Sequence, residues 1–210
     1  MDPVSRAYGP NVSSQAAVSP GRAGRAVMRE TGRTTLDTEA GFVVHTRADH
    51  ELDVAEWLLQ AAADPARARA EWQTMEVALL RCGVEFSAIR VPADVVFAAA
   101  RSEERARVDD YLAAALHGGP VFVDRHSGWY YCLVPADPCT IWRVPDTACL
   151  VAGSYLGVPY PSIDSSRYLA RSSWCVPPDR PEAVCQADAV AQMANLGRFL
   201  LAAAKEADGA

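Results

Sequence analysis

The chain has 210 residues, and half of them are hydrophobic, which is enough to bury one sizeable core. It carries 20 Lys and Arg against 26 Asp and Glu, so its formal net charge is -6. This acidic balance argues against a protein that coats nucleic acid non-specifically, because such proteins need a basic excess to release counterions from phosphates.

Membrane and metal sites are also not expected from the sequence. Its apolar runs are shorter than the roughly 20 residues that span a bilayer, and the N-terminus lacks the order of a secretion signal. The six cysteines form no CxxC pair and no Cys/His pair at zinc-finger spacing. We therefore expect a cytoplasmic protein with no membrane partner, buried thiols and no metal or other cofactor.

Residues 1–39 are rich in Ser, Gly, Pro, Ala and Arg and show no apolar periodicity, which predicts a flexible tail. Residues 40–210 are then a single domain. The scattered arginines of the tail favour a solvated segment over a nucleic-acid contact.

The stretch "ELDVAEWLLQAAADPARARAEWQTMEVALLRCG", which begins at Glu51, has apolar residues at helical spacing. We expect two helices here. Asp64 is the expected N-cap of the second helix and Pro65 its first residue, and Cys82-Gly83 is its expected end. The tryptophans of this stretch are expected to anchor the core.

The next segments alternate between strand and helix patterns. "VEFSAIRVP" predicts a half-buried strand that Pro92 stops. "ADVVFAAARSEERARVDDYLAAALHGG" predicts one long or two short helices, closed by Gly118-Gly119. The charged run over 101–110 is expected to form the solvated face of that helix.

Strands dominate the second half of the chain. "PVFVDR" and "GWYYCLVP" predict a hairpin whose turn is His126-Ser127-Gly128, and "ACLVAGSYLGVPYP" and "SRYLARSSWCVPP" predict further strands of a meander. A closing helix is expected over 181–205. Its expected buried side consists of Ala183, Val184, Val190, Met193, Leu196, Phe199 and Leu200. The whole order predicts an α+β fold with a mostly antiparallel sheet packed with helices.

The hairpin tip is the best local candidate for chemistry. Asp124, His126 and Ser127 are residue types used in nucleophilic and general-base catalysis. Neighbours in sequence scatter around a turn, however, and catalytic triads collect their members from distant segments. We therefore favour a turn at this position. The sequence also contains no phosphate-binding loop, HExxH or G-x-S-x-G motif.

The order of segments in the second half resembles the primase-polymerase-like proteins of actinobacteria, relatives of the archaeo-eukaryotic primases that are often described as bifunctional DNA primase/polymerases. The resemblance lies in "FSAIRVPADVVFAAA", "GGPVFVD", "HSGWYYCLVP" and "CLVAGSYLGVPYPSIDSSRYLARSSWCVPP", followed by a last helix. "AEWLLQAAADPARARAEW" looks like the helical lead-in of these proteins. The resemblance covers roughly Glu51 to Ala204.

The chain departs from that family at the positions that carry its chemistry. In active members the first strand ends in an Asp-x-Asp pair, the hairpin carries a His that contacts the incoming nucleotide, and a later strand supplies a third acid. Here Arg90 and Val91 stand at the first position, and "LVAGSYLGVPYP" at the third has no acid. Without these carboxylates nothing holds Mg²⁺ against substrate phosphates, so the resemblance implies a fold that has lost nucleotidyl transfer.

Our leading hypothesis is a non-catalytic primase-polymerase-like module that binds a nucleotide, nucleic acid or a protein partner. Arg pairs bidentately with phosphate, so we expect a pocket for a phosphate or an acidic partner. Its candidate residues are Arg90, Arg125, His126, Ser127 and Arg167. Taken singly, each of these arginines is better explained by a weak surface ion pair.

Two alternatives remain open. The first is an active, Mg²⁺-dependent DNA primase/polymerase that uses Asp94, Asp124 and His126, with Asp146 as a further acid; it requires carboxylates within about 4 to 6 Å of one another. The second is a protein-interaction module unrelated to nucleotides. It requires a large exposed apolar patch on the aromatic strands that carry Trp129, Tyr130, Tyr131, Trp142, Tyr155 and Tyr160.

Overall fold

The computed structural model describes residues 46–136, 142–167 and 169–208. The expected tail over 1–39 lies outside these residues. In chain order the elements are α1 (Arg47–Gln60), α2 (Pro65–Met75), β1 (Val77–Arg81), β2 (Ser87–Pro92), α3 (Ala93–Ala100), α4 (Arg105–Ala115), β3 (Val121–Asp124), β4 (Trp129–Val134), β5 (Ala148–Leu150), β6 (Tyr155–Pro159), β7 (Ser172–Val176) and α5 (Ala187–Asp208). The predicted α+β class is confirmed.

The strands form two antiparallel sheets. The larger one has the order β5-β2-β4-β3-β7, and β1 pairs with β6 in a separate two-stranded ribbon, here called the β1–β6 ribbon. The mostly antiparallel prediction is confirmed, but the simple meander is wrong. The segment Val77–Arg81 is a strand, and β6 leaves the main sheet to pair with it.

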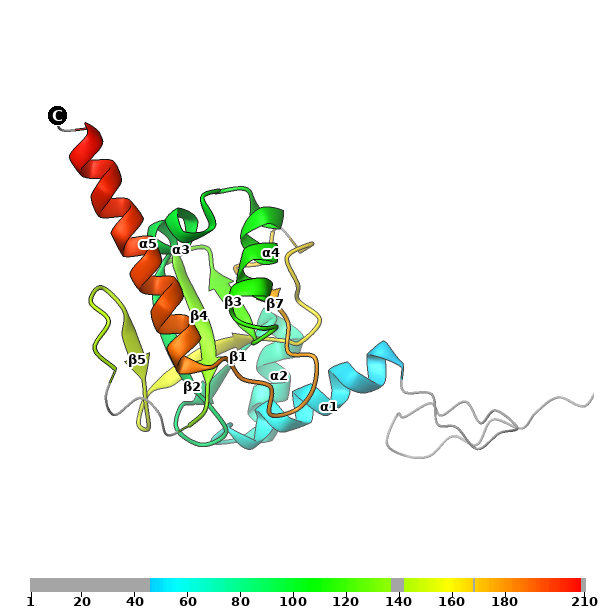
Figure 1. Ribbon diagram of the computed structural model, residues 1–210. Helices are drawn as coiled ribbons and strands as arrows, with labels where there is room; N and C mark the ends of the chain where they lie inside the picture. The colour runs from blue at the N-terminus through cyan, green and yellow to red at the C-terminus, as the bar shows by residue number, and fades with distance from the viewer. Residues whose placement is uncertain (1–45, 137–141, 168, 209–210) are drawn as a thin grey trace, which may run out of the picture.

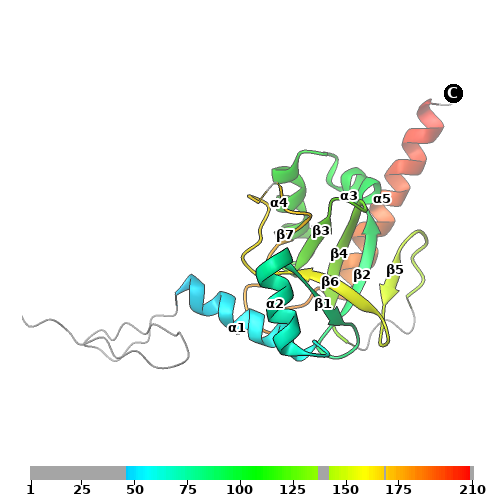
Figure 2. The same cartoon turned by 180° about the vertical axis from the view of Figure 1, so that it is seen from behind.

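Both faces of the main sheet are covered. Helices α3, α4 and α5 pack on one face, here called the helix face, against residues such as Val91, Val123 and Cys132 (Figure 1). The β1–β6 ribbon with α1 and α2 lies on the opposite face, here called the ribbon face, against residues such as Phe122 and Trp174 (Figure 2). Each face therefore buries its own apolar core.

The second helix ends earlier than its sequence suggested. Asp64 is its N-cap as predicted, and its side chain accepts hydrogen bonds from the N–H groups of Ala66 and Arg67 at 3.0 and 3.1 Å. The end predicted at Cys82-Gly83 is wrong. Glu76 adopts a left-handed backbone with φ of 60°, and its N–H donates to the carbonyl of Trp72, which ends the helix. The chain then continues as β1.

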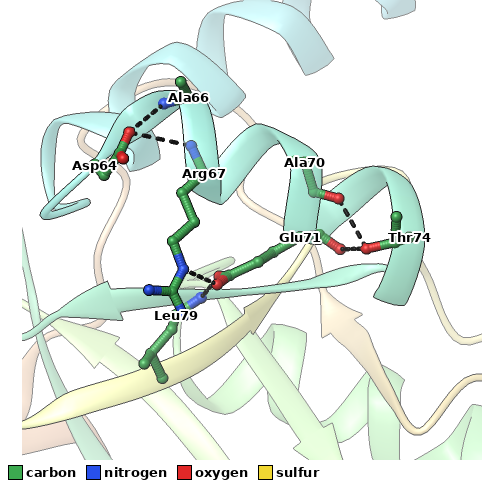
Figure 3. A network of polar contacts seen from close by, with 7 residues as sticks. All are labelled: Asp64, Ala66, Arg67, Ala70, Glu71, Thr74 and Leu79. Atoms are coloured by element: carbon green, nitrogen blue, oxygen red, sulfur yellow. Dashed lines mark hydrogen bonds and ion pairs between the residues drawn. The ribbon is translucent and has the colours of Figure 1, made fainter.

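Glu71 of α2 forms a hydrogen bond with the backbone at the outer edge of β1 (Figure 3). Its carboxylate accepts a hydrogen bond of 2.9 Å from the backbone N–H of Leu79 and one of 2.8 Å from Nε of Arg67. The backbone bond to Leu79, followed by the bond to Arg67, holds the pKa of Glu71 below its usual value. The next outward N–H, that of Arg81, donates to the carbonyl of Ala61 at 2.9 Å. These bonds protect β1 from pairing with another strand.

The remaining helices follow the prediction except in α5. The segment after β2 forms two short helices, separated at Arg101, which has φ of 52°. Helix α5 begins at Ala187, so the expected start at residue 181 is wrong. Val190 and Met193 are buried as expected, whereas Leu196 and Phe199 are 43% and 68% exposed. The C-terminal part of α5 extends past the main sheet (Figures 1 and 2). None of the helices described is both long enough and apolar enough to cross a lipid bilayer.

The cysteines are not all small buried thiols. Cys82, Cys132 and Cys185 are free and buried, as expected, and Cys175 is free and half-buried. Cys149 is disulfide-bonded, which corrects the expectation for that residue. Trp57 and Trp72 are buried core anchors, as predicted.

Candidate functional site

The hairpin tip is a turn whose polar groups bond mainly to one another. The carboxylate of Asp124 accepts a hydrogen bond of 3.0 Å from the N–H of His126, and the carbonyl of Asp124 accepts one of 3.0 Å from the N–H of Gly128. Gly128 has φ of 70°, a conformation that favours glycine. His126 and Ser127 are exposed. These contacts support the interpretation of the tip as a turn.

Asp124 and Arg125 act on opposite faces of the main sheet. Asp124 is the register partner of Trp129 and Ser172, and directly opposed residues share a face, so all three lie on the ribbon face. The guanidinium of Arg125 donates to Oγ of Ser173 at 2.8 Å and to the carbonyl of Ala170 at 3.2 Å. It lines a pocket on the helix face.

The other two predicted arginines also have separate surroundings. The guanidinium carbon of Arg90 lies 4.7 Å from the centre of the Trp129 ring, in a cation–π contact, and its Nε is buried without a hydrogen-bond partner among the described residues. Arg167 forms an ion pair with Glu76. The five residues predicted to bind a ligand therefore do not meet at one point.

The carboxylates of the enzyme alternative bind three different partners. Asp94 accepts a hydrogen bond of 2.9 Å from the N–H of Val95. Asp124 lies 3.7 Å from Nε of Arg171. Asp146 accepts a hydrogen bond of 3.1 Å from Arg198 of α5. Within residues 46–136, 142–167 and 169–208, no group of three or more His, Cys, Asp and Glu side chains is arranged to hold a metal ion.

A pocket of about 430 Å³ opens between the β1–β6 ribbon, α2 and the hairpin end of the main sheet; we call it the hairpin pocket. Its apolar lining comes from α2 and the ribbon, and its polar lining comes mainly from the main sheet and the residue preceding β7. The apolar residues are Met75, Val77, Leu79, Leu156 and Gly157, and the polar ones are Glu71, Asp124, Tyr131, Arg171 and Ser172. Sites for small organic ligands combine these two kinds of surface.

Gly157 keeps the floor of the hairpin pocket open. A Cβ at this position would lie 3.0 Å from Cγ1 of Val77, which is tighter than ordinary contact. A glycine inside a strand is the one signal in the sequence that indicates such a close approach. Gly157, Arg171 and Ser172 were not among the site residues predicted from the sequence.

Tyr131 supplies the aromatic group of the hairpin pocket. Its ring stacks on Phe122 with centroids 5.0 Å apart and an interplanar angle of 17°. Partial burial raises the pKa of the Tyr131 phenol above its usual value, so the hydroxyl is a neutral hydrogen-bond donor at physiological pH.

On the helix face, Asp109 of α4 is a half-buried acid within a run that was expected to be fully solvated. Its Oδ1 is buried and has no hydrogen-bond partner among the described residues. Burial raises the pKa of Asp109 above 3.8, against the opposing effect of hydrogen bonds from Ser165 and Cys175.

Replacing Asp109 with asparagine is expected to stabilise the protein at pH 7. The folded state binds the Asp109 proton more tightly than the unfolded state, so stability falls as the pH rises from 3.8 through the raised pKa. Asp109→Asn removes this loss. Urea unfolding of both proteins should show the gain at pH 7, and the gain should vanish below about pH 4; an equal gain at both pH values would contradict this account.

The covering of the main sheet counts against the protein-interaction alternative. It required an open, apolar face on the aromatic strands, whereas helices cover one face of the main sheet and the ribbon and its helices cover the other (Figures 1 and 2). Of the aromatic residues predicted for that patch, Tyr130 is only 6% exposed, whereas Tyr155 on β6 is 54% exposed.

Comparison of the chain with protein-family models, with curated proteins and with solved structures found no match.

Proposed function

We propose that this protein is a non-catalytic, primase-polymerase-like module that binds a nucleotide in the hairpin pocket. The observation that carries the proposal is the meeting of two segments that the family resemblance singles out. The hairpin contributes Asp124 and Tyr131, and the segment at the third acidic position contributes Leu156 and Gly157 to the same pocket.

The lining of the hairpin pocket suits the two halves of a nucleotide. The apolar floor around Val77, Leu79 and Gly157 offers a surface for a base, with the Tyr131 hydroxyl available for its polar edge. Arg171 and Ser172 lie at the polar side, where a guanidinium and a hydroxyl are suitable donors to a phosphate. Its volume of about 430 Å³ lies in the range of small-molecule sites.

The same surroundings argue against nucleotidyl transfer. Two-metal transfer needs carboxylates that converge on the substrate phosphates. Arg90 occupies the expected place of the first acid and stacks on Trp129, and the third segment presents the backbone of Gly157 to the pocket. Two carboxylates line the hairpin pocket, and each has a partner already: Arg171 lies beside Asp124, and Glu71 accepts hydrogen bonds from Arg67 and Leu79.

Titration with a fluorescent deoxynucleoside triphosphate, followed by anisotropy, tests this proposal. Arg171→Gln is expected to weaken binding roughly tenfold, because it removes one charge-assisted contact to phosphate. Arg180→Gln is the matched control, since Arg180 is also an exposed arginine paired with an aspartate but lies outside the pocket. Gly157→Val should abolish binding by filling the floor, with circular dichroism confirming that the variant is folded.

A primer-extension assay with Mg²⁺ or Mn²⁺ tests the non-catalytic part separately. We expect nucleotide binding without extension. Extension by the wild-type protein that is lost in Asp94→Ala or Asp124→Ala would restore the enzyme alternative. Absence of binding, or binding that neither Arg171→Gln nor Gly157→Val weakens, would refute the proposed site.

A further inference from the structure

A second pocket, of about 490 Å³, lies on the helix face under the same hairpin, and we call it the helix-face pocket. It is separate from the hairpin pocket, and the two share no lining residue. Its walls come from α3, α4, the hairpin and β7. Its charged lining consists of the arginines Arg105 and Arg125 and the acids Glu103 and Asp109, and its aromatic lining consists of Phe97 and Tyr130.

Two guanidinium groups line the helix-face pocket, and backbone carbonyls hold both of them. Arg105 donates to the carbonyl of Ser165 at 3.0 Å, and Arg125 donates to that of Ala170 at 3.2 Å. Burial, and next the positive charge of Arg105, lower the pKa of Arg125. Like charges gathered at one cavity are stabilised by a shared anion.

Apart from Glu103 and Asp109, the remaining walls are mainly aromatic and apolar. Phe97 of α3 and Tyr130 of β4 meet edge to face with ring centroids 6.1 Å apart, and Val123 lies beside them in the lining. Such a surface suits the apolar or aromatic body of a ligand whose charged end faces the arginines.

Asp109 is the half-buried acid in the lining of this pocket. The charged and titratable groups facing its carboxyl are Arg105 on its own helix, Arg125 from the hairpin, Tyr130 from β4 and Cys175 from β7. Because burial raises the pKa of Asp109, the acid gains its proton at a higher pH than an exposed aspartate. The protonated form does not repel an anion and has a hydroxyl that can donate to one.

We propose that the helix-face pocket binds a small organic anion, with its carboxylate or phosphate on Arg105 and Arg125 and its apolar or aromatic body against Phe97 and Tyr130. The site is independent of the nucleotide in the hairpin pocket. Carboxylate and phosphate ligands share this chemistry, and titration with one ligand of each kind separates them.

NMR titration of the ¹⁵N-labelled full chain with benzoate, phenyl phosphate and benzylamine tests the proposal. We expect the two anions to shift the amide signals of Phe97, Gly128 and Cys175, with the tighter of them identifying the preferred head group. The signals of Leu156 and Gly157 should not move with benzoate, which separates this site from the hairpin pocket. Preference for benzylamine, or no shift at Phe97, Gly128 and Cys175 with either anion, would refute the proposal.

Variants of α4 locate the anion. Arg105→Gln should weaken binding roughly tenfold, and Arg105→Lys, which keeps the charge, should recover part of the loss. Arg107→Gln is the matched control, because Arg107 lies on the same helix and pairs with Glu104. Equal affinities of Arg105→Gln and Arg107→Gln would exclude Arg105 from the site.

Asp109→Asn provides the pH test. For the wild-type protein, affinity for the anion should rise as the pH falls through the titration of Asp109. The variant should bind roughly threefold more tightly than the wild type at pH 7, because a like charge is gone, and should lose the pH dependence. A pH dependence that survives in Asp109→Asn would assign the effect to another group and overturn this role of Asp109.

Discussion

Replacing Trp174 with alanine is expected to lower the free energy of unfolding by about 4 kcal/mol. Trp174 on β7 is 0% exposed and is the largest of the fully buried side chains described. Its ring meets Phe122 edge to face with centroids 5.3 Å apart, and its Nε1 donates to the carbonyl of Tyr160 at 3.2 Å. The substitution therefore leaves a cavity in the ribbon-face core and an unpaired carbonyl.

Urea unfolding of the full chain, followed by circular dichroism, measures the loss. Phe199→Ala is the control, since Phe199 is 68% exposed and its removal should change stability by no more than about 0.5 kcal/mol. Trp174→Phe should fall between the two, because it keeps an aromatic ring and loses the indole donor. A loss below about 1.5 kcal/mol for Trp174→Ala would show that this core closes around the gap.

Local patterns in the sequence were sufficient for most of the elements. The Asp64-Pro65 pair marked the start of α2, and the alternation around Gly128 marked the β3–β4 hairpin. Both signals depend on backbone geometry within a few residues. Both elements can therefore be predicted without knowledge of the rest of the fold.

The β1–β6 ribbon could not be predicted in the same way. "VALLR" follows α2 directly, and its apolar residues fit a helical spacing as well as a strand. The switch occurs at Glu76, a residue type that rarely adopts a left-handed backbone, so no turn signal marks it. The edge bond from Leu79 to Glu71 and the distant partner strand β6 decide the outcome.

The candidate site was only partly accessible from sequence for a related reason. The hairpin was identified, and Asp124 does line a pocket, but the register with β7 determines that Ser172 joins it. Arg125, the next residue in the sequence, lines the helix-face pocket on the opposite side of the main sheet. A prediction that groups residues by closeness in sequence therefore combines two different pockets.

The second large effect on stability is expected at Gly197, where α5 crosses α3. A Cβ at this position would overlap the carbonyl oxygen of Val95 and lie 2.9 Å from the carbonyl carbon. Backbone atoms cannot turn away as a flexible side chain does. Gly197→Ala must therefore separate the two helices and loosen the helix-face core, where Val190 and Met193 of α5 are buried.

The expected result for Gly197→Ala is a loss of about 2 kcal/mol in the free energy of unfolding. Helix propensity acts in the opposite direction, because alanine favours a helix over glycine by about 1 kcal/mol. Asn195→Ala isolates that propensity, since Asn195 is exposed on the same helix, and it should gain a few tenths of a kcal/mol. If urea unfolding shows Gly197→Ala to be as stable as the wild type while Asn195→Ala behaves as expected, the close contact between α5 and Val95 does not limit stability. A loss confined to Gly197→Ala would show that the helix layer depends on this one approach of two backbones.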